Sequence, residues 1–292
     1  MRWLRNLFAR PEPSAAPAAP AAGLPGAAPP PPAPSASAAP ADGSDWVSHQ
    51  RTSAQGPVGL AVDLSLGARA PDLARPRLAR VRCLLAAPRD DGQPGPAEAE
   101  RLAKVEDVLA RELAPLDATY AGRVTLAGAR EHLFYLPDAT PAAAVDAAHD
   151  RARVAVAGYD LTPLAEDDPA WHAYRAELFP TPRTLRFLLD RRALEAPGRR
   201  GDAGPRPVDH QASFPSAEAR EAFAAEAASQ GFAAVARRDD APAPNPFAVD
   251  LRRVDPLALR ELHAVTWSLC ELAGRHGGAY DGWTLDQDAT AA

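Results

Sequence analysis

Lysine is nearly absent from this chain of 292 residues, because Lys104 is the only one and arginine supplies the rest of the positive charge. No segment is strongly basic: residues 44–180 carry 15 basic against 20 acidic side chains, and residues 181–292 carry 14 against 16. Proteins that bind nucleic acid mainly through its phosphates show a basic stripe. With a net charge of −6, the chain is therefore not expected to bind nucleic acid directly in this way.

Cysteine is scarce as well. The two cysteines, Cys83 and Cys270, lie in apolar segments, and neither has a CxxC or CxxH neighbourhood. Structural zinc sites use pairs of cysteine or histidine ligands at such short spacings, and neither cysteine belongs to such a pair. We therefore expect buried free thiols, no metal and no cofactor, and a disulfide between the two cysteines stays open as the alternative.

The signature motifs of common enzymes are missing too. The sequence contains no Walker loop, GxGxxG, HExxH or GxSxG, and no cysteine in a recognisable nucleophile setting. His132 lies in a predicted strand without a second ligand, and His149 and Asp150 lie near a helix end. We therefore predict no catalytic residue. A hydrolase built on scattered acids, such as Asp281 with His276, is the alternative.

Residues 1–43 consist mostly of Ala, Pro, Ser and Gly. This composition buries too little apolar surface to offset the entropy of ordering, so we predict a disordered tail. Its first ten residues, "MRWLRNLFAR", place apolar side chains on one helical face and arginines on another. The decapeptide is too short for a signal peptide or a membrane span, and it is either a frayed terminus or a weak docking peptide for a membrane surface or a protein.

Residues 44–180 predict an antiparallel α+β domain of unknown function. Alternating apolar residues predict two strands within 46–66, one within 77–86, two within 120–137 and one near 159–164. Helical spacing predicts helices over 96–115, 141–152 and 168–179.

The pattern after residue 180 is easier to interpret. Residues 181–207 predict a connector helix and a linker, and residues 208–288 a domain with the order βαββαβ. In that domain Ser216 is predicted to cap the first helix. Asp255 is predicted to cap the second helix, with Pro256 as its first residue. Short connections and right-handed crossovers favour a ferredoxin-like sheet with strand order 4-1-3-2. The fold class is therefore α+β, with two antiparallel-sheet α/β-plait domains behind the tail.

The segment "HGGAYDGW" is explained by this fold. Gly277 and Gly278 are predicted to end the second helix, because a residue at positive φ is needed there, and His276 suits the negative end of the helix dipole. Gly282 predicts a bulge or a close backbone contact in the last strand.

The helices of such a domain cover one face of the sheet and leave the other open. The open face is predicted to be polar and to lack the aromatic side chains on which RNA-recognition sheets stack bases. We therefore predict that it binds a protein. The predicted partner-binding residues are Asp209, Gln211, Asp250 and Arg252 on the open face, with Tyr280, Asp281 and Trp283 in the last strand. A direct RNA-binding module that uses Arg199, Arg200 and Arg206 is the alternative.

From Val208 to Gln287 the sequence resembles the RraB family, regulators of ribonuclease E activity B. The residues that carry the resemblance are "HGGAYDGW", the "AREAF" helix, the "GF" after it and "VDLRR". It implies a non-catalytic cytoplasmic protein that binds ribonuclease E, or another component of the RNA-degradation assembly, and inhibits it. Residues 44–180 resemble the family catalogued as domain of unknown function 695, through "VEDVLARELA", "GRVTLAGAREHLFY" and "DPAWHAYRAELFPT". The oligomeric state stays open.

Overall fold

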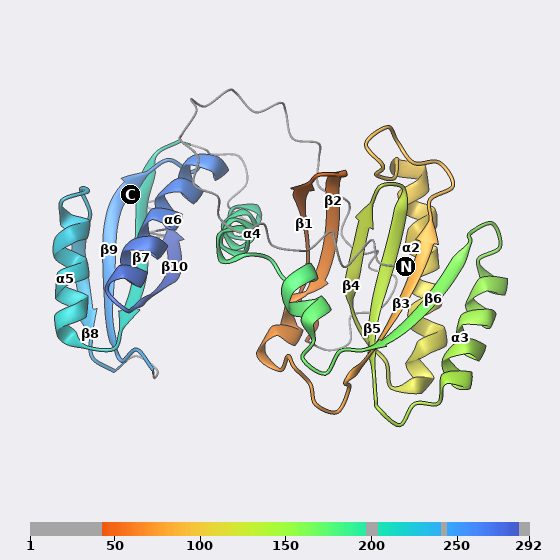
Figure 1. The fold of residues 1–292 in the computed structure, drawn as a ribbon. Coiled ribbons are helices and arrows are strands. Elements are labelled where there is room, and N and C mark those ends of the chain that lie inside the picture. Colours follow the sequence, from red (N-terminus) through yellow and green to blue (C-terminus); the bar gives the residue numbers. More distant parts are fainter. Residues whose placement is uncertain (1–42, 197–203, 241–243, 286–292) are drawn as a thin grey trace. The chain divides into compact units, whose positions relative to one another are not determined.

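The computed structural model describes residues 43–196, 204–240 and 244–285 (Figure 1). The chain divides into two compact units that meet in sequence between Phe179 and Pro180. Apart from Gly43, the predicted tail and its decapeptide lie outside the described residues, as do Arg199 and Arg200.

A six-stranded antiparallel sheet forms the first unit, in the order β1-β2-β4-β5-β3-β6. Its strands are β1 (Trp46–Ser53), β2 (Gly56–Asp63), β3 (Arg77–Leu84), β4 (Thr119–Leu126), β5 (Ala129–Leu136) and β6 (Leu161–Asp167). The 3-10 segments η1 (Leu64–Ala68) and η2 (Ala114–Leu116) follow β2 and the first helix. The predicted strands of this unit are all present.

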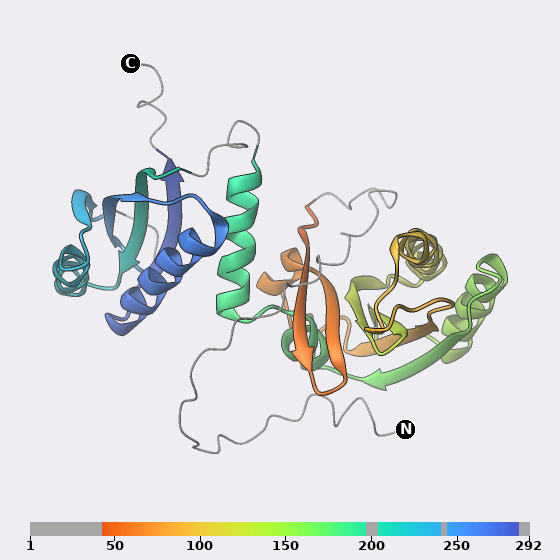
Figure 2. The same ribbon diagram turned by 90° about the horizontal axis from the view of Figure 1, so that it is seen from above.

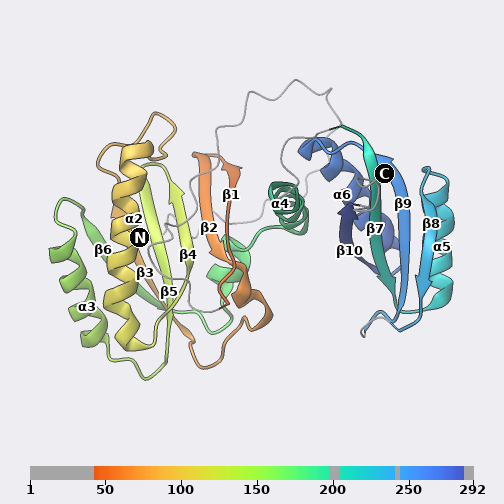
Figure 3. The ribbon, with the colours of Figure 1, turned by 180° about the vertical axis from the view of Figure 1, so that it is seen from behind.

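Two helices, α2 (Pro96–Leu113) and α3 (Ala142–Ala155), lie on the same face of this sheet (Figure 3). Leu102 and Leu109 of α2 and Ala148 of α3 pack against inward residues of β3 and β5 such as Val81 and Phe134. This apolar layer is one part of the core of the first unit.

The helix predicted over 168–179 is shorter than expected. Only η3 (Ala173–Leu178) forms there, as a π-helical turn, and Trp171 before it adopts a φ of 52°. The Asp168 carboxylate accepts hydrogen bonds from the main-chain N–H groups of His172 and Ala173. These bonds tie Asp168 to the start of the turn, and the positive φ of Trp171 keeps the residues before it out of the helix.

The second unit has the predicted ferredoxin-like topology. Its elements are α4 (Pro182–Glu195), β7 (Arg206–Phe214), α5 (Ala217–Ala228), β8 (Ala233–Arg238), β9 (Phe247–Asp255), α6 (Leu259–Arg275) and β10 (Ala279–Leu285). The sheet order β10-β7-β9-β8 is the predicted 4-1-3-2 (Figure 2). Phe223 of α5 and Leu269 and Leu272 of α6 pack on Phe214 and Val249 of the sheet.

The start of α6 differs from the prediction. Asp255 does not cap this helix, because it is the last residue of β9 and its carboxylate is buried against His210. The helix begins at Leu259, with Ala258 as its N-cap residue. A buried partner for the Asp255 carboxylate outweighs its propensity to cap a helix.

Each of the three glycines near the end of the chain is needed for a different structural reason. Gly277 adopts a φ of 70° after α6, and the register of β10 shifts between Tyr280 and Gly282, so the predicted bulge is present. Gly278 lies against Phe214, where a Cβ atom would come within 2.2 Å of the ring. Lack of a side chain at residue 278 therefore allows the connection between α6 and β10 to approach the end of β7 closely.

A substitution at this position is predicted to be costly. Gly278→Ala is expected to lower the free energy of unfolding of the second unit by about 1–3 kcal/mol, because Phe214 and the Ser213 carbonyl must move. Gly274→Ala is the matched control: no atom lies within 4 Å of its Cβ position, and alanine favours the helix by about 1 kcal/mol. Urea unfolding of both variants tests this, and equal stabilities would contradict it.

Candidate functional site

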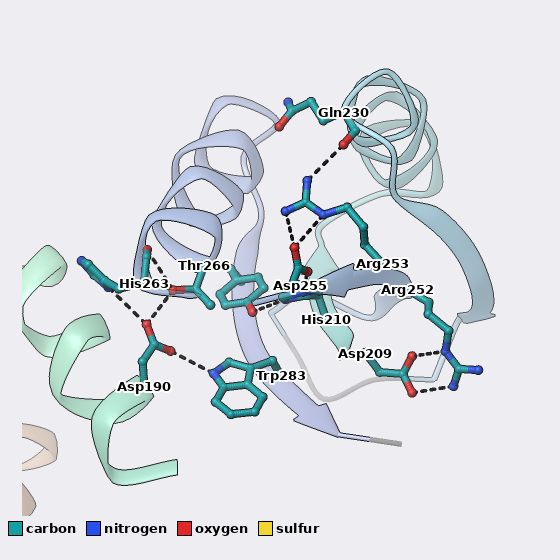
Figure 4. Close-up of polar contacts among 11 residues, drawn as sticks. Asp190, Asp209, His210, Gln230, Arg252, Arg253, Asp255, His263, Thr266 and Trp283 are labelled. Atoms are coloured by element: carbon teal, nitrogen blue, oxygen red, sulfur yellow. Dashed lines mark hydrogen bonds and ion pairs between the residues drawn. The ribbon is translucent and has the colours of Figure 1, made fainter. Parts of the chain in front are cut away.

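The open face of the second sheet carries two ion pairs. The β7–β9 register sets Asp209 opposite Arg252 and Gln211 opposite Asp250. Arg252 donates from Nε to Asp209 Oδ1 at 2.6 Å and from Nη2 to Oδ2 at 2.7 Å (Figure 4). The hydrogen bond from Arg252 holds the pKa of Asp209 below its usual value, so the pair stays ionised near neutral pH.

The second pair joins β8 to β9. Arg238 donates from Nη2 to Asp250 Oδ1 at 2.9 Å and from Nη1 to the other carboxylate oxygen. Both pairs are bidentate, and they lie in neighbouring rows of the same face. The face therefore presents fixed, alternating charges.

Small residues surround these charges. The register places Ala233 beside Arg252, and Gly282 beside Gln211. The Asp281 carboxylate accepts a hydrogen bond from Ser213 Oγ at 3.2 Å, and burial raises the pKa of Asp281. Among the described strand residues whose register places them on this face, none is aromatic.

The other two predicted site residues lie on the opposite face. Tyr280 pairs with Ala212 and Trp283 with His210, and both of these β7 residues point toward the helices. Strict alternation would have put Tyr280 and Trp283 on different faces, but the bulge before Gly282 turns both inward. Trp283 is only 7% exposed, so its role in partner binding, like that of Tyr280, stays a prediction.

Behind the sheet, three polar side chains form a buried chain. His210 is 1% exposed; its Nε2 donates to Asp255 Oδ2 at 2.9 Å, and its Nδ1 lies 2.8 Å from the Tyr280 hydroxyl. Arg253 donates from Nε to the other oxygen of Asp255 at 2.8 Å. Because His210 lies between the predicted open-face residues Asp209 and Gln211, strand alternation places it on the inward side, but the sequence does not identify its partners, which lie 45 and 70 residues away.

Burial alone would raise the pKa of Asp255, but hydrogen bonds from His210 and Arg253 outweigh it and hold the pKa below its usual value. Burial raises the pKa of the Tyr280 phenol, which therefore stays protonated. A protonated phenol is a poor nucleophile. We interpret the chain Tyr280–His210–Asp255 as a support that joins β7, β9 and β10.

A second buried carboxylate joins α4 to the same unit. Asp190 is fully buried and accepts hydrogen bonds from His263 Nδ1, Thr266 Oγ1 and Trp283 Nε1 at 3.1, 2.6 and 3.0 Å (Figure 4). Arg186 donates to it from the same helix. The helix predicted as part of a connector thus packs on α6 and β10.

Two histidines of the first unit, His132 and His149, make structural contacts. His132 is fully buried; its Nδ1 lies 3.1 Å from the Tyr120 hydroxyl, and burial, with Arg130 and Arg123, lowers its pKa well below the usual value. His149 Nε2 donates to the Leu161 carbonyl at 3.1 Å. His149 also borders a cavity of about 100 Å³ between the sheet and α3, where most lining side chains are apolar.

Two ion pairs stabilise the first unit from opposite faces of its sheet. Arg80 makes a bidentate contact with Glu177 at 2.9 and 3.0 Å, and Arg123 pairs with Glu106.

In the ranges that the structure describes, no group of three or more His, Cys, Asp or Glu side chains is arranged to hold a metal ion.

Both cysteines are free thiols. Cys83 is buried and Cys270 half-buried, and burial raises their pKa values to about 12 and about 11. The alternative of a disulfide between them is not seen. Thiols with such pKa values are protonated near neutral pH and unreactive as nucleophiles.

Asp281 and His276, which the hydrolase alternative would use together, each bond to another residue. His276 Nε2 lies 2.9 Å from Glu226 Oε2 on α5, and Asp281 is bonded to Ser213 on the open face. The structure does not bring His276 and Asp281 together as a pair.

Comparison with known proteins assigns both units. Residues 192–284 match the family model "Regulator of ribonuclease activity B" (RraB), and residues 44–179 match a family of unknown function, DUF695. The chain joins a DUF695 domain to an RraB domain. Both resemblances inferred from the sequence are thereby confirmed.

Other comparisons add little to this assignment. No curated protein matches the chain. A crystal structure of an unknown protein from Galdieria sulphuraria is 14% identical, over 72% of this chain and 99% of that one, with a TM-score of 0.20. That score is too low to relate the two folds.

Within the described residues, no helix has the length and apolar character needed to cross a membrane.

The hydrogen-bonded series Tyr280–His210–Asp255 in the RraB domain leads to a prediction about how stability depends on pH. Because the folded-state pKa of Asp255 is depressed, its contribution to stability is complete above the unfolded value of about 3.9 and is lost as the pH falls through the folded value. Asp255→Asn is expected to lower the free energy of unfolding by about 3 kcal/mol near neutral pH, and by less at about pH 3. Urea unfolding at both pH values measures this.

Asp240→Asn, at an exposed position in the same domain, is the control and is expected to change little at either pH. A loss for Asp255→Asn that is equal at both pH values would contradict an ionised Asp255 in the fold.

Proposed function

We propose that this protein is a non-catalytic regulator of ribonuclease activity, which binds ribonuclease E or another RNA-decay component in the cytoplasm through the open face of its RraB domain. The match to RraB over residues 192–284 carries the proposal. The family is described as a regulator of ribonuclease activity, and the naming of ribonuclease E as partner is our extension.

The open face suits a protein partner. Its two bidentate pairs, Asp209 with Arg252 and Arg238 with Asp250, hold both signs of charge in fixed positions on the sheet. A rigid pattern of mixed charge favours one complementary protein surface over others and costs little ordering entropy on binding. Single-stranded RNA would instead need stacking platforms and an excess of positive charge, which this face does not offer.

Exchanging the two charges of one pair separates surface recognition from folding. In the double variant Asp209→Arg with Arg252→Asp, the pair can re-form in reverse, so the free energy of unfolding is expected to change by less than about 1 kcal/mol. The charge pattern offered to a partner is inverted, and affinity is expected to fall at least about tenfold. The measurements are binding of the full chain to purified ribonuclease E and inhibition of its RNA cleavage.

Arg260→Glu is the matched control, because Arg260 is an exposed arginine at the start of α6, away from the open face. It is expected to bind and inhibit like the unaltered chain. Equal inhibition by the unaltered chain and the double variant would contradict the assigned surface. Tight RNA binding by the chain alone, with a steep dependence of log affinity on log salt, would contradict a protein-directed role.

A further inference from the structure

The first unit contains a small cavity between its sheet and helix α3, which Figure 3 shows beside α2 on the same face of the sheet. The cavity volume is about 100 Å³. Apolar side chains form most of the wall, and the buried ones among them include Ala79, Val81, Leu109, Leu113, Leu136 and Val145. Such a wall offers water few hydrogen bonds, so the cavity favours an apolar group.

The cavity reaches the surface between α3 and β6. Two of its lining residues on α3, Ala142 and Asp146, are exposed, and so are residues 163–165 of β6. In the described sheet β6 is an edge strand that pairs with β3 only. A small molecule can therefore enter beside this strand while the sheet stays intact.

Two opposite charges border the cavity without pairing with each other. Arg77 donates from Nη1 to the Thr140 carbonyl at 2.6 Å, and among the described residues its Nε and Nη2 have no acceptor. The Asp146 carboxylate makes no hydrogen bond or ion pair with another described residue. Asp167 lies opposite Arg77 in the β3–β6 register, and within the described part of the chain it forms no ion pair with Arg77. Both Arg77 and Asp146 are therefore available to a ligand.

The other titratable lining residues are engaged elsewhere. Arg80 is held by Glu177 on the opposite face of the sheet, and His149 Nε2 donates to the Leu161 carbonyl. The polar end of a ligand in this cavity is therefore expected to meet only the two rim charges.

These rim charges select the polar end of a ligand. Because only Nη1 of Arg77 is used, Nε and Nη2 can donate two parallel hydrogen bonds to one carboxylate. The Asp146 carboxylate in turn binds an ammonium group. A molecule that carries both groups satisfies both charges, whereas a simple carboxylic acid would bring a like charge near Asp146. The rim therefore favours a zwitterion.

The volume of the cavity limits the apolar part of the ligand. An apolar cavity of about 150 Å³ holds benzene, which has six carbon atoms. By proportion, a cavity of about 100 Å³ holds a group of about four carbon atoms. The branched side chains of leucine and isoleucine have this size.

We propose that the first unit binds a free amino acid with a branched aliphatic side chain, such as leucine, in the cavity between α3 and β6. The aliphatic side chain fills the cavity, the carboxylate binds Arg77 and the ammonium group binds Asp146. The site belongs to the DUF695 domain, so it does not depend on the open face of the RraB domain or on the proposed ribonuclease contact.

The test is isothermal titration calorimetry of the full chain with leucine and with three related molecules. Leucine is expected to bind with a Kd below about 1 mM. Isocaproate lacks the ammonium group and isoamylamine lacks the carboxylate, so each is expected to bind at least about tenfold more weakly. Alanine leaves most of the cavity empty and is also expected to bind at least about tenfold more weakly.

Variants of the full chain test the same contacts from the side of the protein. Asp146→Asn is expected to weaken leucine binding at least about tenfold and to leave isocaproate binding no weaker than before. Asp150→Asn is the matched control, because Asp150 is an exposed acid of the same helix that does not line the cavity. It is expected to bind leucine like the unaltered chain. Ala165→Leu fills the cavity from the exposed strand β6 and is expected to abolish leucine binding.

The absence of leucine binding at about ten times the expected Kd would overturn the proposal. Equal affinities for leucine and isocaproate would also overturn it, because the ammonium group would then have no role. Leucine binding that is the same in Asp146→Asn and in the unaltered chain would place the ligand elsewhere and contradict the site. If Ala165→Leu does not fold, Asp146→Asn decides, since that change lies at an exposed position.

Discussion

Two buried carboxylates, Asp190 and Asp255, set the arrangement of the RraB domain. Each is at most 1% exposed, and each accepts hydrogen bonds from elements far apart in sequence. Removing a carboxylate from water is costly unless every lone pair finds a donor, so the partners of these acids are held in fixed positions. Asp255 thereby joins β9 to β7 and, through His210, to β10, while Asp190 joins α4 to α6 and β10.

These internal bonds explain which residues remain for a partner. The bulge before Gly282 turns Tyr280 and Trp283 toward the helices, where they bond to His210 and Asp190. Only the side chains of the opposite face, chiefly Asp209, Gln211, Asp250, Arg252 and Asp281, stay on the open side. The same sheet therefore has an inner face that specifies the fold and an outer face that carries alternating charges in fixed ion pairs.

The order βαββαβ, with short connections and right-handed crossovers, was enough to predict the sheet order, and the alternation of apolar and polar residues in β7 was enough to predict the polar character of the open face. It could not predict the bulge in β10, because a single inserted residue leaves the local pattern almost unchanged while it reverses which face a side chain joins. Nor could local patterns reveal that Asp255 bonds to His210 or Asp190 to Trp283, since these partners lie 45 and 93 residues apart. Helix α4 was predicted as a helix, but its packing depends on one of these distant bonds.

The most direct test of the open face as the contact surface is an amide chemical-shift titration of the full chain with ribonuclease E. If the partner binds there, the largest changes are expected at Asp209, Gln211 and Asp250, with little change along the outer side of α5. Changes confined to α5 or to the first unit, with the β7 and β9 amides unaffected, would contradict an RraB domain that acts through its open sheet face.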